Sequence, residues 1–451
     1  MQPISHSVLS KYPVQVPRYT SYPTAPHFHT LSTGIHESWI RDIAAATPIS
    51  LYVHIPYCKK LCWFCGCNTQ ITQKYGPVES YLELLFKEIR LVAGKMGRRQ
   101  LVSHIHFGGG SPTLLTPQDF EQVMVLLGET FTIQPGAVIA IEADPRGMSE
   151  AKMASYAKHG VNRISIGVQD FDPAVQEAVS RIQPFRTVYN AVRTCHEYGV
   201  DDISIDLIYG LPKQNLESFK QTLEYTLLLD PGRIALFGYA HVPWKKKNMR
   251  LISEDDLPDA NERFAMFDAA TACFKAAGYV PIGLDHFAKC DDSMAVALKE
   301  HRLRRNFQGY TTDKSEVILG LGASAISSFA QGYVQNATSV DTYEKALSSG
   351  TLATARGFSL SAEDLLRRSI INSLMCYFEA DIASLCEKVG QQVSMFDDVF
   401  LHLKQMQADG LLILANHHIR IHTDFPQAMR LVCAAFDRYF LPNTVKHAQI
   451  A

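Results

Sequence analysis

Strand-like and helical patterns alternate six times between residues 51 and 239, and this alternation restricts the fold more than any other feature. Short apolar runs typical of buried strands occur at 51–56, 103–107, 137–143, 162–168, 202–210 and 233–239. Amphipathic helical patterns separate them at 78–95, 116–131, 149–160, 185–199 and 215–229. Such alternation is typical of a parallel sheet covered by helices, either a barrel or an open doubly wound sheet. We favour a full or partial barrel of the TIM type.

The segments on either side of this region have a different texture. Residues 1–49 lack clear periodicity and are rich in proline, so we expect an irregular arm with one helix near 36–46, which we interpret as a lid. Beyond residue 355, helical patterns return and a two-stranded hairpin follows Gly410, as in a small winged-helix-like domain. The expected division is therefore an arm at 1–49, a barrel at 50–355 and a mainly helical domain at 356–451.

The composition narrows the class of protein. The chain has 451 residues, is 47% hydrophobic and 20% charged, and carries a net charge of −2. It has neither a basic stripe for nucleic acid nor an apolar run of about 18 residues for a membrane span, so we expect neither partner. Because its start does not resemble a signal peptide, we expect the protein in the cytoplasm, where thiols stay reduced.

The ten cysteines are unevenly distributed. Four of them, Cys58, Cys62, Cys65 and Cys67, lie within ten residues directly after a predicted strand. The others stand alone and are expected to pack as small apolar side chains: Cys195, Cys273, Cys290, Cys376, Cys386 and Cys433. A local cluster of reduced cysteines is more often metal-binding or catalytic than crosslinked.

The spacing Cys58-x3-Cys62-x2-Cys65 indicates the kind of metal centre. Structural zinc normally takes four ligands, often from two paired cysteine motifs, and the sequence has no second pair. Three thiolates on one loop instead suit a 4Fe–4S cluster whose fourth iron stays open to an exogenous amine and carboxylate. Cys67 as a fourth ligand would close that iron, so we do not assign it to the cluster. Structural zinc and a redox dithiol are the alternatives.

Two glycine-rich segments compete as ligand-binding loops. Gly108, Gly109 and Gly110 follow the strand at 103–107 and permit either the close approach of a ligand or a tight turn. Residues 320–325 fit the GxGxxA pattern of a dinucleotide site, with Asp341 21 residues beyond the first glycine. Because Asp341 lies at a predicted helix start instead of a strand end, we favour the first segment.

Several polar side chains interrupt the predicted strands. Glu142 and Asp206 lie in otherwise apolar runs, and a buried carboxylate is costly unless it meets a ligand or a cation. His104 and His106 alternate with a buried isoleucine and are as compatible with packing as with a ligand role. Arg181 follows a helix, where an arginine is usually solvated, so on its own it is a weak indicator of a site.

The sequence resembles one family over most of its length. The stretches that carry the resemblance are PRYTSYPTA, YVHIPYCKKLCWFCGCN, GGGSPT, EADPRG, SIGVQDF, DLIYGLP, GLDHFA and NFQGYTT. Together they resemble the oxygen-independent coproporphyrinogen III oxidases (coproporphyrinogen dehydrogenases) of the radical S-adenosylmethionine superfamily. The matches run from about residue 10 to residue 440. The heme chaperones of this superfamily share the cysteine loop but normally lack the arm, the CGCN ending and NFQGYTT.

The resemblance implies a partial barrel of six strand–helix units with a C-terminal helical domain, and a particular set of cofactors. A 4Fe–4S cluster would be held by Cys58, Cys62 and Cys65, and two S-adenosylmethionine molecules would bind beside it. Residues carried over for the first molecule are Tyr52, Gly109, Glu142 and Ile326. Residues carried over for the second are Phe64, Cys67, Gly110, Ser111, Gln169, Arg181, Asp206 and Ala240. Ser111 stands where the family usually has threonine, and the hydroxyl group is kept.

The activity that the resemblance implies is that of an oxidoreductase of heme and porphyrin biosynthesis. Two propionate side chains of coproporphyrinogen III would each lose a hydrogen to a 5′-deoxyadenosyl radical and then CO2, which gives the vinyl groups of protoporphyrinogen IX. A monomer is expected, with an electron donor such as flavodoxin or ferredoxin and an electron acceptor that the sequence leaves open. The four substrate carboxylates need basic contacts, for which Arg18 is the first candidate and residues 245–247, all lysine, are the second. A heme-binding chaperone and a zinc-containing winged-helix regulator are the rival functions.

Overall fold

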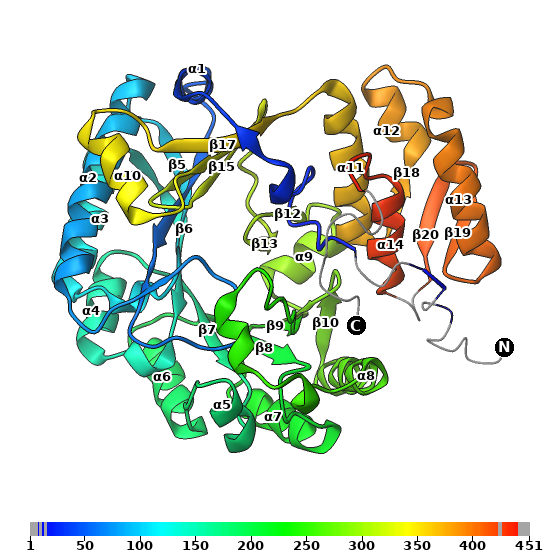
Figure 1. The fold of residues 1–451 in the computed structure, drawn as a ribbon, viewed down its shortest axis with the longest axis horizontal. Coiled ribbons are helices and arrows are strands. Elements are labelled where there is room, and N and C mark those ends of the chain that lie inside the picture. The colour runs from blue at the N-terminus through cyan, green and yellow to red at the C-terminus, as the bar shows by residue number, and fades with distance from the viewer. Residues whose placement is uncertain (1–7, 9–10, 13–15, 423–425, 441–451) are drawn as a thin grey trace.

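The computed structural model describes residues 8, 11–12, 16–422 and 426–440, and its largest element is a curved sheet of 13 strands (Figure 1). Outside the described residues lie the first residues of the predicted arm and the last residues of the predicted C-terminal domain. The predicted strands are present as β2 (Ile49–Ile55), β5 (Leu101–Gly109), β6 (Thr132–Ala143), β7 (Arg163–Gln169), β8 (Asp202–Tyr209) and β9 (Arg233–Gly238). They pair in parallel in this order, which confirms the predicted α/β class.

Helices cover the outer face of the parallel strands, and in Figure 1 they run from the left side of the molecule along its bottom. They are α2 (Gly76–Met96), α3 (Pro117–Thr130), α4 (Glu150–Lys158), α5 (Pro173–Ala178), α6 (Phe185–Glu197), α7 (Leu216–Leu228) and α8 (Ala260–Ala276). Side-chain caps start several of them; the hydroxyl of Thr116, for example, accepts the N–H of Asp119 at 3.2 Å. Glycines at positive φ follow two of the helix ends, Gly160 after α4 and Gly199 after α6.

The alternation of side chains along the strands separates a packed face from a polar face. In β7 the apolar residues Ile164, Ile166 and Val168 are buried against the helices. The alternate residues of β7 and β8, including Ser165 and Asp206, face the inside of the barrel, where they line cavities. Because successive side chains of a strand point to opposite faces, an apolar run interrupted by polar residues produces a barrel with a polar interior.

A seventh parallel strand, which the sequence pattern did not identify, lies on the other side of β2. This strand, β14 (Ile318–Leu321), is only four residues long, and its register places Gly320 opposite Tyr52. Antiparallel strands then extend the sheet through β15 (Ile326–Phe329), β16 (Gly332–Asn336), β17 (Thr354–Ser359) and β1 (His29–Thr30). At the far edge, β11 (His286–Lys289) and β10 (Tyr279–Ile282) follow β9. Within the described residues the two edges do not pair with each other, so the barrel is partial.

The GxGxxA segment at 320–325 is a strand-to-strand turn. It connects β14 to the antiparallel strand β15, whereas a dinucleotide-binding loop leads from a strand into a helix. Asp341 lies in the first turn of α10 (Val340–Ser348), capped by Ser339. The buried carboxylate of Glu88 in α2 holds the turn by accepting the N–H of Gly322 at 2.5 Å. The alternative of a nicotinamide site here is therefore rejected.

The C-terminal part has the predicted order of helices followed by a hairpin. Its elements are α11 (Ala362–Tyr377), β18 (Glu379–Asp381), α12 (Ile382–Lys388), α13 (Asp397–Ala408), β19 (Leu412–Ala415), β20 (His418–Ile421) and α14 (Ala428–Ala435). The strands form a separate three-stranded sheet in the order β18-β20-β19. Figure 1 shows this part on the right, beside the barrel. The final helix is shorter than the pattern at 426–439 indicates.

The N-terminal arm is built into the C-terminal part of the molecule. Tyr12, Tyr19 and Tyr22 are buried in the same apolar cluster as α11, α13 and α14. The next segment contains α1 (Thr33–Arg41) and packs instead against the barrel core through Trp39 and Ile40. The prediction of one helix near 36–46 is confirmed with an earlier start. The burial of the tyrosines could not be predicted, because a proline-rich segment has no periodicity that marks a buried face.

The remaining short elements lie between these parts. They are β3 (Tyr57–Cys58), β4 (Gln70–Ile71), α9 (Ser293–Lys299), β12 (Arg304–Asn306) and β13 (Gly309–Thr311). In Figure 1 the β12–β13 hairpin lies between the barrel and α11. Within the described part of the chain, every helix is too short or too polar to span a bilayer.

Candidate active site

The cysteine loop follows the carboxyl end of β2 and opens onto a cavity inside the barrel mouth. This cavity, which we call the cysteine cavity, has a volume of about 190 Å³. Cys58, Cys62, Cys65 and Cys67 all line it, together with residues from the ends of the next strands. Those residues are Gly109, Gly110, Glu142, Asp144, Gln169, Arg181 and Asp206. The carboxyl ends of barrel strands are the usual place for an active site.

Hydrogen-bond donors surround the sulfur atoms. The hydroxyl of Thr69 donates to the sulfur of Cys58 at 3.3 Å, and Nη1 of Arg181 donates to the sulfur of Cys62 at 3.4 Å. A hydrogen bond with the thiol of Cys67 lowers the pKa of Cys65 to about 6. Burial has the opposite effect on Cys58, whose pKa it raises to about 11, so it is Cys65 that its surroundings shift toward the thiolate form.

The donor set fits a 4Fe–4S cluster better than a single metal ion. Among the described residues, no three His, Cys, Asp or Glu side chains are close enough together to hold one ion, as a zinc site with Zn–S bonds of about 2.3 Å requires. The cysteines instead line the wall of a cavity. Cys67 is the exposed member of the four and lines a second cavity as well as the first, and its omission from the cluster ligands stays a prediction.

Two residues of a distant segment hold the cysteine loop, Lys246 from the lysine stretch noted in the sequence and Asn248, which the sequence did not single out. The side-chain amide of Asn248 donates to the carbonyl groups of Trp63 at 2.9 Å and Cys65 at 3.0 Å. The ammonium group of Lys246 donates to the carbonyl of Cys67 at 3.0 Å. The basic stretch 245–247 therefore lies against the cysteine loop, although none of its lysines lines the cysteine cavity. No motif signals this contact, because the partners are backbone carbonyls.

The glycine run at the end of β5 allows side chains of the neighbouring strands to approach closely. A Cβ atom on Gly108 would lie 2.7 Å from Oε1 of Glu142, and one on Gly109 would lie 2.6 Å from the ring of His54. Gly109 also has φ of +115°, which disfavours any other residue. The glycines therefore allow the tight turn, and Gly109 also lines the cysteine cavity, as the ligand-binding interpretation expects.

Glu142 is held by its neighbours in a charged form. Its Oε1 lies 3.0 Å from Nε2 of His106, and its Oε2 accepts the N–H of Gly109 at 3.3 Å. Burial opposes ionisation, but the hydrogen bond and charge of His106 outweigh it and lower the pKa of Glu142. His106 thus has a positioning role. His104, on the same face of β5, lies 3.1 Å from Asp313.

Asp206 titrates differently from Glu142. Burial raises the pKa of Asp206 to about 6, although the hydroxyl of Ser165 donates to it at 2.8 Å. Two carboxylates with pKa values shifted in opposite directions therefore line one cavity, a pattern often found where protons or cationic ligands are handled.

A second cavity, which we call the tyrosine cavity, adjoins the first and has a volume of about 330 Å³. Tyr52, Glu142, Gly109 and Ile326 line it, and these are the residues carried over for the first S-adenosylmethionine. Cys67, Gly109 and Glu142 belong to both cavities. Phe307 and Gln308, at the tip of the β12–β13 hairpin, also line it. Only their place within NFQGYTT indicated them in the sequence.

Residues carried over for the second S-adenosylmethionine gather in the cysteine cavity. Phe64, Cys67, Gly110, Gln169, Arg181 and Asp206 line it, whereas Ser111 and Ala240 are not among its lining residues. Arg181 is buried instead of solvated, with Nη2 donating to the carbonyl of Gly167 at 2.7 Å and Nη1 3.5 Å from Asp144. Its Nε has no hydrogen-bond partner. The usual solvation of an arginine after a helix does not apply to Arg181, which lines the cysteine cavity as the carried-over assignment expects.

Arg18 lies in a separate small cavity at the edge of the barrel. Its Nη2 donates to the carbonyl of Gly238, at the end of β9, at 2.5 Å. Three further arginines, Arg263, Arg305 and Arg430, line this cavity with a single carboxylate, Asp285. Arg18 itself remains exposed to solvent at this pocket. Arg18 therefore belongs to a pocket with four arginines and one carboxylate, and its contact with a substrate carboxylate stays a prediction.

Comparison with known proteins agrees with this geometry. Residues 52–226 match the model of the Radical SAM superfamily, and residues 360–422 match the HemN C-terminal domain. The oxygen-independent coproporphyrinogen III oxidase of Bradyrhizobium diazoefficiens is 44% identical over 96% of this chain and 97% of its own length. The enzyme of the same name from Pseudomonas aeruginosa is 39% identical over 97% and 96%.

A solved structure extends the comparison to three dimensions. The coproporphyrinogen III oxidase of Escherichia coli, described as a radical SAM enzyme, superposes with a TM-score of 0.90 at 36% identity. The alignment covers 97% of this chain and 100% of the other. The cysteine loop, the partial barrel and the relatives that match nearly end to end lead to one conclusion: the chain belongs to the oxygen-independent coproporphyrinogen III oxidase family of the radical SAM superfamily.

Proposed function

We propose that this protein converts coproporphyrinogen III to protoporphyrinogen IX without oxygen, by oxidative decarboxylation of two propionate side chains. The observation that carries the proposal is the convergence of three cysteines and nearly all carried-over cofactor residues on two adjoining cavities. Relatives named for this activity match the chain over almost its whole length.

Cys58, Cys62 and Cys65 would hold a 4Fe–4S cluster in the cysteine cavity. When bound together, the cluster and S-adenosylmethionine supply a 5′-deoxyadenosyl radical that removes the β-hydrogen of a propionate, a step too difficult for a side chain. Two S-adenosylmethionine molecules are proposed, the first in the tyrosine cavity and the second beside the cysteines. Two adjoining cavities, one lined by the whole first carried-over set and the other by six of the eight residues of the second set, support this stoichiometry.

The protein's own residues bind and orient these groups. The ionised Glu142 stands where the two cavities meet and presents a negative charge to a cationic sulfonium ligand. Thr69 and Arg181 donate to the sulfur atoms of Cys58 and Cys62, contacts that would tune the potential of a cluster held by these cysteines. Asp206, with its pKa near 6, holds a proton part of the time at neutral pH.

We propose an acidic flavodoxin or ferredoxin as electron donor, with an exposed basic surface around the cysteine loop as its docking site. Lys59, Lys60, Lys245 and Lys247 are exposed on this side of the molecule, and opposite charges steer such encounters. Replacing Lys59 and Lys247 by glutamate is expected to slow turnover with the protein donor at least tenfold. Turnover with dithionite is expected to change little, and equal slowing with both reductants would contradict the docking site.

The remaining expectations are proposals of the same kind. We propose a cytoplasmic monomer, and the free state of all ten cysteines supports the cytoplasmic location. We propose three regions, an arm at 1–49, a barrel from residue 50 and a C-terminal helical domain. The last boundary is better drawn after Ser359 than at 355, because β17 runs to that residue. The arm is proposed to close the site, since Thr20, Ser21 and Tyr22 line a cavity beside it.

An anaerobic assay tests the proposed activity. The reconstituted protein, S-adenosylmethionine, a reductant and coproporphyrinogen III are expected to give protoporphyrinogen IX, detected after oxidation as the divinyl porphyrin. Stoichiometric heme binding without vinyl product would instead indicate the chaperone function. Metal analysis is expected to find about four iron and four sulfide per chain. One zinc without visible absorbance would indicate the regulator.

A further inference from the structure

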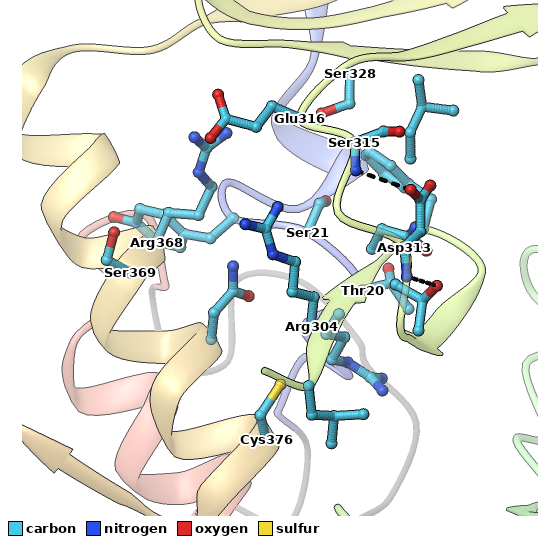
Figure 2. Close-up of a pocket in the computed structure, with 18 of the residues that line it drawn as sticks. Thr20, Ser21, Arg304, Asp313, Ser315, Glu316, Ser328, Arg368, Ser369 and Cys376 are labelled. Atoms are coloured by element: carbon cyan, nitrogen blue, oxygen red, sulfur yellow. Dashed lines mark hydrogen bonds between the residues drawn. The ribbon is translucent and has the colours of Figure 1, made fainter. Parts of the chain in front are cut away.

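A cavity lined by arginines lies between the barrel and the C-terminal part of the described chain, and it is larger than the cysteine and tyrosine cavities. We call it the arginine cavity; its volume is about 550 Å³, within the roughly 300–1,000 Å³ range of small-molecule sites. Four separate segments enclose it: residues 20–22 of the arm, the β12–β13 hairpin, the strands β14 and β15, and α11. Figure 2 shows Arg304, from the hairpin, and Arg368, from α11, extending into the same space.

Three arginines line this cavity without a carboxylate partner. Nη1 of Arg304 donates to the carbonyl of Lys314 at 2.8 Å, and Nη1 of Arg368 lies 3.5 Å from the hydroxyl of Tyr333. Arg305 donates to the carbonyl of Tyr19 at 3.3 Å and has an unpaired Nη1. Within the described residues, none of the three forms an ion pair within 4.0 Å. Elsewhere in the chain, the buried Arg233 meets both Asp202 and Asp292.

The acidic residues of the cavity do not neutralise these arginines. Asp313 is engaged by His104 at 3.1 Å and by the N–H of Ser315 at 2.8 Å. Glu316 is exposed and forms no ion pair within 4.0 Å among the described residues. The cavity therefore presents an excess of positive charge in a chain whose net charge is −2. Guanidinium groups without a carboxylate suit a planar anion such as a carboxylate of a ligand.

The arginine cavity adjoins the site of the proposed chemistry. Phe307 and Ile318 line both the arginine cavity and the tyrosine cavity. Thr311 and Asp313 line both the arginine cavity and the polar interior of the barrel. Apolar and aromatic walls, including Leu303, Tyr333 and Leu365, accompany the arginines. A ligand held here has a flat apolar body, anionic substituents and one end that reaches the cofactors.

We propose that the arginine cavity binds the tetrapyrrole ring of the substrate, with Arg304 and Arg368 each holding a propionate that is not reacting. The proposal rests on the proposed function, because only a porphyrinogen tetracarboxylate combines such a ring with spare carboxylates beside a reacting one. Arg305 stands between this cavity and the small pocket of Arg18, so a further propionate has a basic neighbour there. Arg304 and Arg368 are thus substrate-binding residues outside every sequence motif.

Substitution by methionine, which keeps the length of the side chain and removes its charge, tests the two arginines. Arg304→Met and Arg368→Met are each expected to raise the KM for coproporphyrinogen III about tenfold or more, with a smaller change in kcat. The control is Arg302→Met, two residues away, whose guanidinium is exposed and pairs with Glu300 outside the cavity. Arg305 is left intact because it also holds carbonyls of the arm. An unchanged KM in both variants, with cluster absorbance and Tm as in the wild type, would overturn the proposal.

A binding measurement separates this inference from the proposed activity. Quenching of porphyrin fluorescence by the holoenzyme is compared for coproporphyrin, a tetracarboxylate, and for a dicarboxylate of the same ring. The wild type is expected to prefer the tetracarboxylate, and the double variant Arg304→Met/Arg368→Met is expected to lose at least tenfold of that preference. Equal preference in both proteins overturns the inference. If the wild type prefers the tetracarboxylate but forms no vinyl product, the proposed activity is contradicted. The arginine site is then still supported by the binding data.

Discussion

The cysteine cavity and the arginine cavity are built in opposite ways. The sulfur atoms of the first come from residues 58–67, a stretch short enough to be read directly in the sequence. The walls of the second come from the arm, the hairpin, two strands and α11, which span more than 300 residues of the chain. A metal cluster requires ligands at fixed distances, which one short loop can supply. Arginines that bind the carboxylates of a large ligand can come from many different positions in the chain, so they form no motif in the sequence.

The two cavities also treat charge differently. In the cysteine cavity, the guanidinium group of Arg146 pairs with Asp144 at 2.6 Å, and Arg181 lies 3.5 Å from the same carboxylate. In the described part of the chain, the arginines of the arginine cavity form hydrogen bonds with carbonyl and hydroxyl oxygens and no ion pair within 4.0 Å. In the cysteine cavity a carboxylate of the protein offsets the charge of the arginines. In the arginine cavity the charge of the arginines is left for an anionic ligand to neutralise.

The largest expected effect is the loss of a cluster ligand, which should disable the cysteine cavity and leave the arginine cavity unchanged. Replacing Cys65 by serine is expected to abolish cluster absorbance and turnover, because only a thiolate of the loop can complete the three-ligand set. The far-UV CD spectrum is expected to stay unchanged. The matched control is Cys290→Ser, since Cys290 is exposed and distant from the loop. A Cys65→Ser protein with full iron and sulfide content would refute the ligand assignment.

A smaller loss of activity is expected from replacing Arg181, which links the cysteine loop to Asp144 at the end of β6. Arg181→Met removes a donor to the sulfur of Cys62 and a cation beside Asp144, and we expect a 10- to 100-fold loss of activity or cluster stability. The redox potential, measured by titration of cluster absorbance, is expected to fall. Arg193→Met, on the outer face of α6, serves as control because Arg193 pairs only with Glu197. A potential and an activity equal to those of the wild type would show that Arg181 does not act on the cluster.

The arginine cavity depends on the seating of the arm, which Arg430 secures. This buried arginine donates to the carbonyl groups of Val16 and Pro17. Arg430→Met is expected to lower the free energy of unfolding by about 1–3 kcal/mol, because the two carbonyls lose charged donors. Limited proteolysis is expected to cut the arm sooner, with the cysteine cavity and its cluster intact. Simultaneous loss of cluster and arm would show that the two regions are not independent.

The smallest effect concerns a buried carboxylate outside both cavities. Burial raises the pKa of Glu88 to about 7, although Tyr343, Gly322 and Asn336 all donate to it. A raised pKa in the folded state means that protonated Glu88 contributes stability below its unfolded pKa of 4.5, and that this contribution disappears as pH rises through about 7. The Tm of the wild type is therefore expected to fall between pH 5 and pH 8.

Glu88→Gln is expected to remove this pH dependence. At pH 5 the variant is less stable by about 1–3 kcal/mol, because its amide turns a donor toward another donor. The difference is expected to shrink toward pH 8, where the wild type carries a buried charge. Thermal unfolding across this range measures both effects. Parallel pH profiles for the two proteins would mean that another group is responsible.

Much of the fold was predictable because its signals are local. The periodicity of apolar residues identified the six parallel strands and the helices after them. The strand β14 was missed because four buried residues beside glycines do not differ from a loop in sequence. In the site, Cys58, Cys62, Cys65 and the glycines were readable from spacing alone. Asn248 and Arg304 could not be identified in this way. An asparagine that donates to backbone carbonyls, or an arginine without an ion pair, produces no recognisable sequence pattern.

The sequence by itself determined the chemistry that depends on neighbouring residues: three thiols on one loop, glycines at a strand end, and carboxylates in apolar strands. Only the tertiary structure decided which distant side chains face that chemistry. It turned Arg181 inward, set Asn248 over the cysteine loop and left Arg304 and Arg368 without a carboxylate across one cavity. The reason is physical. Covalent spacing fixes distances within a loop, whereas contacts between distant segments follow from how the whole chain buries its apolar faces.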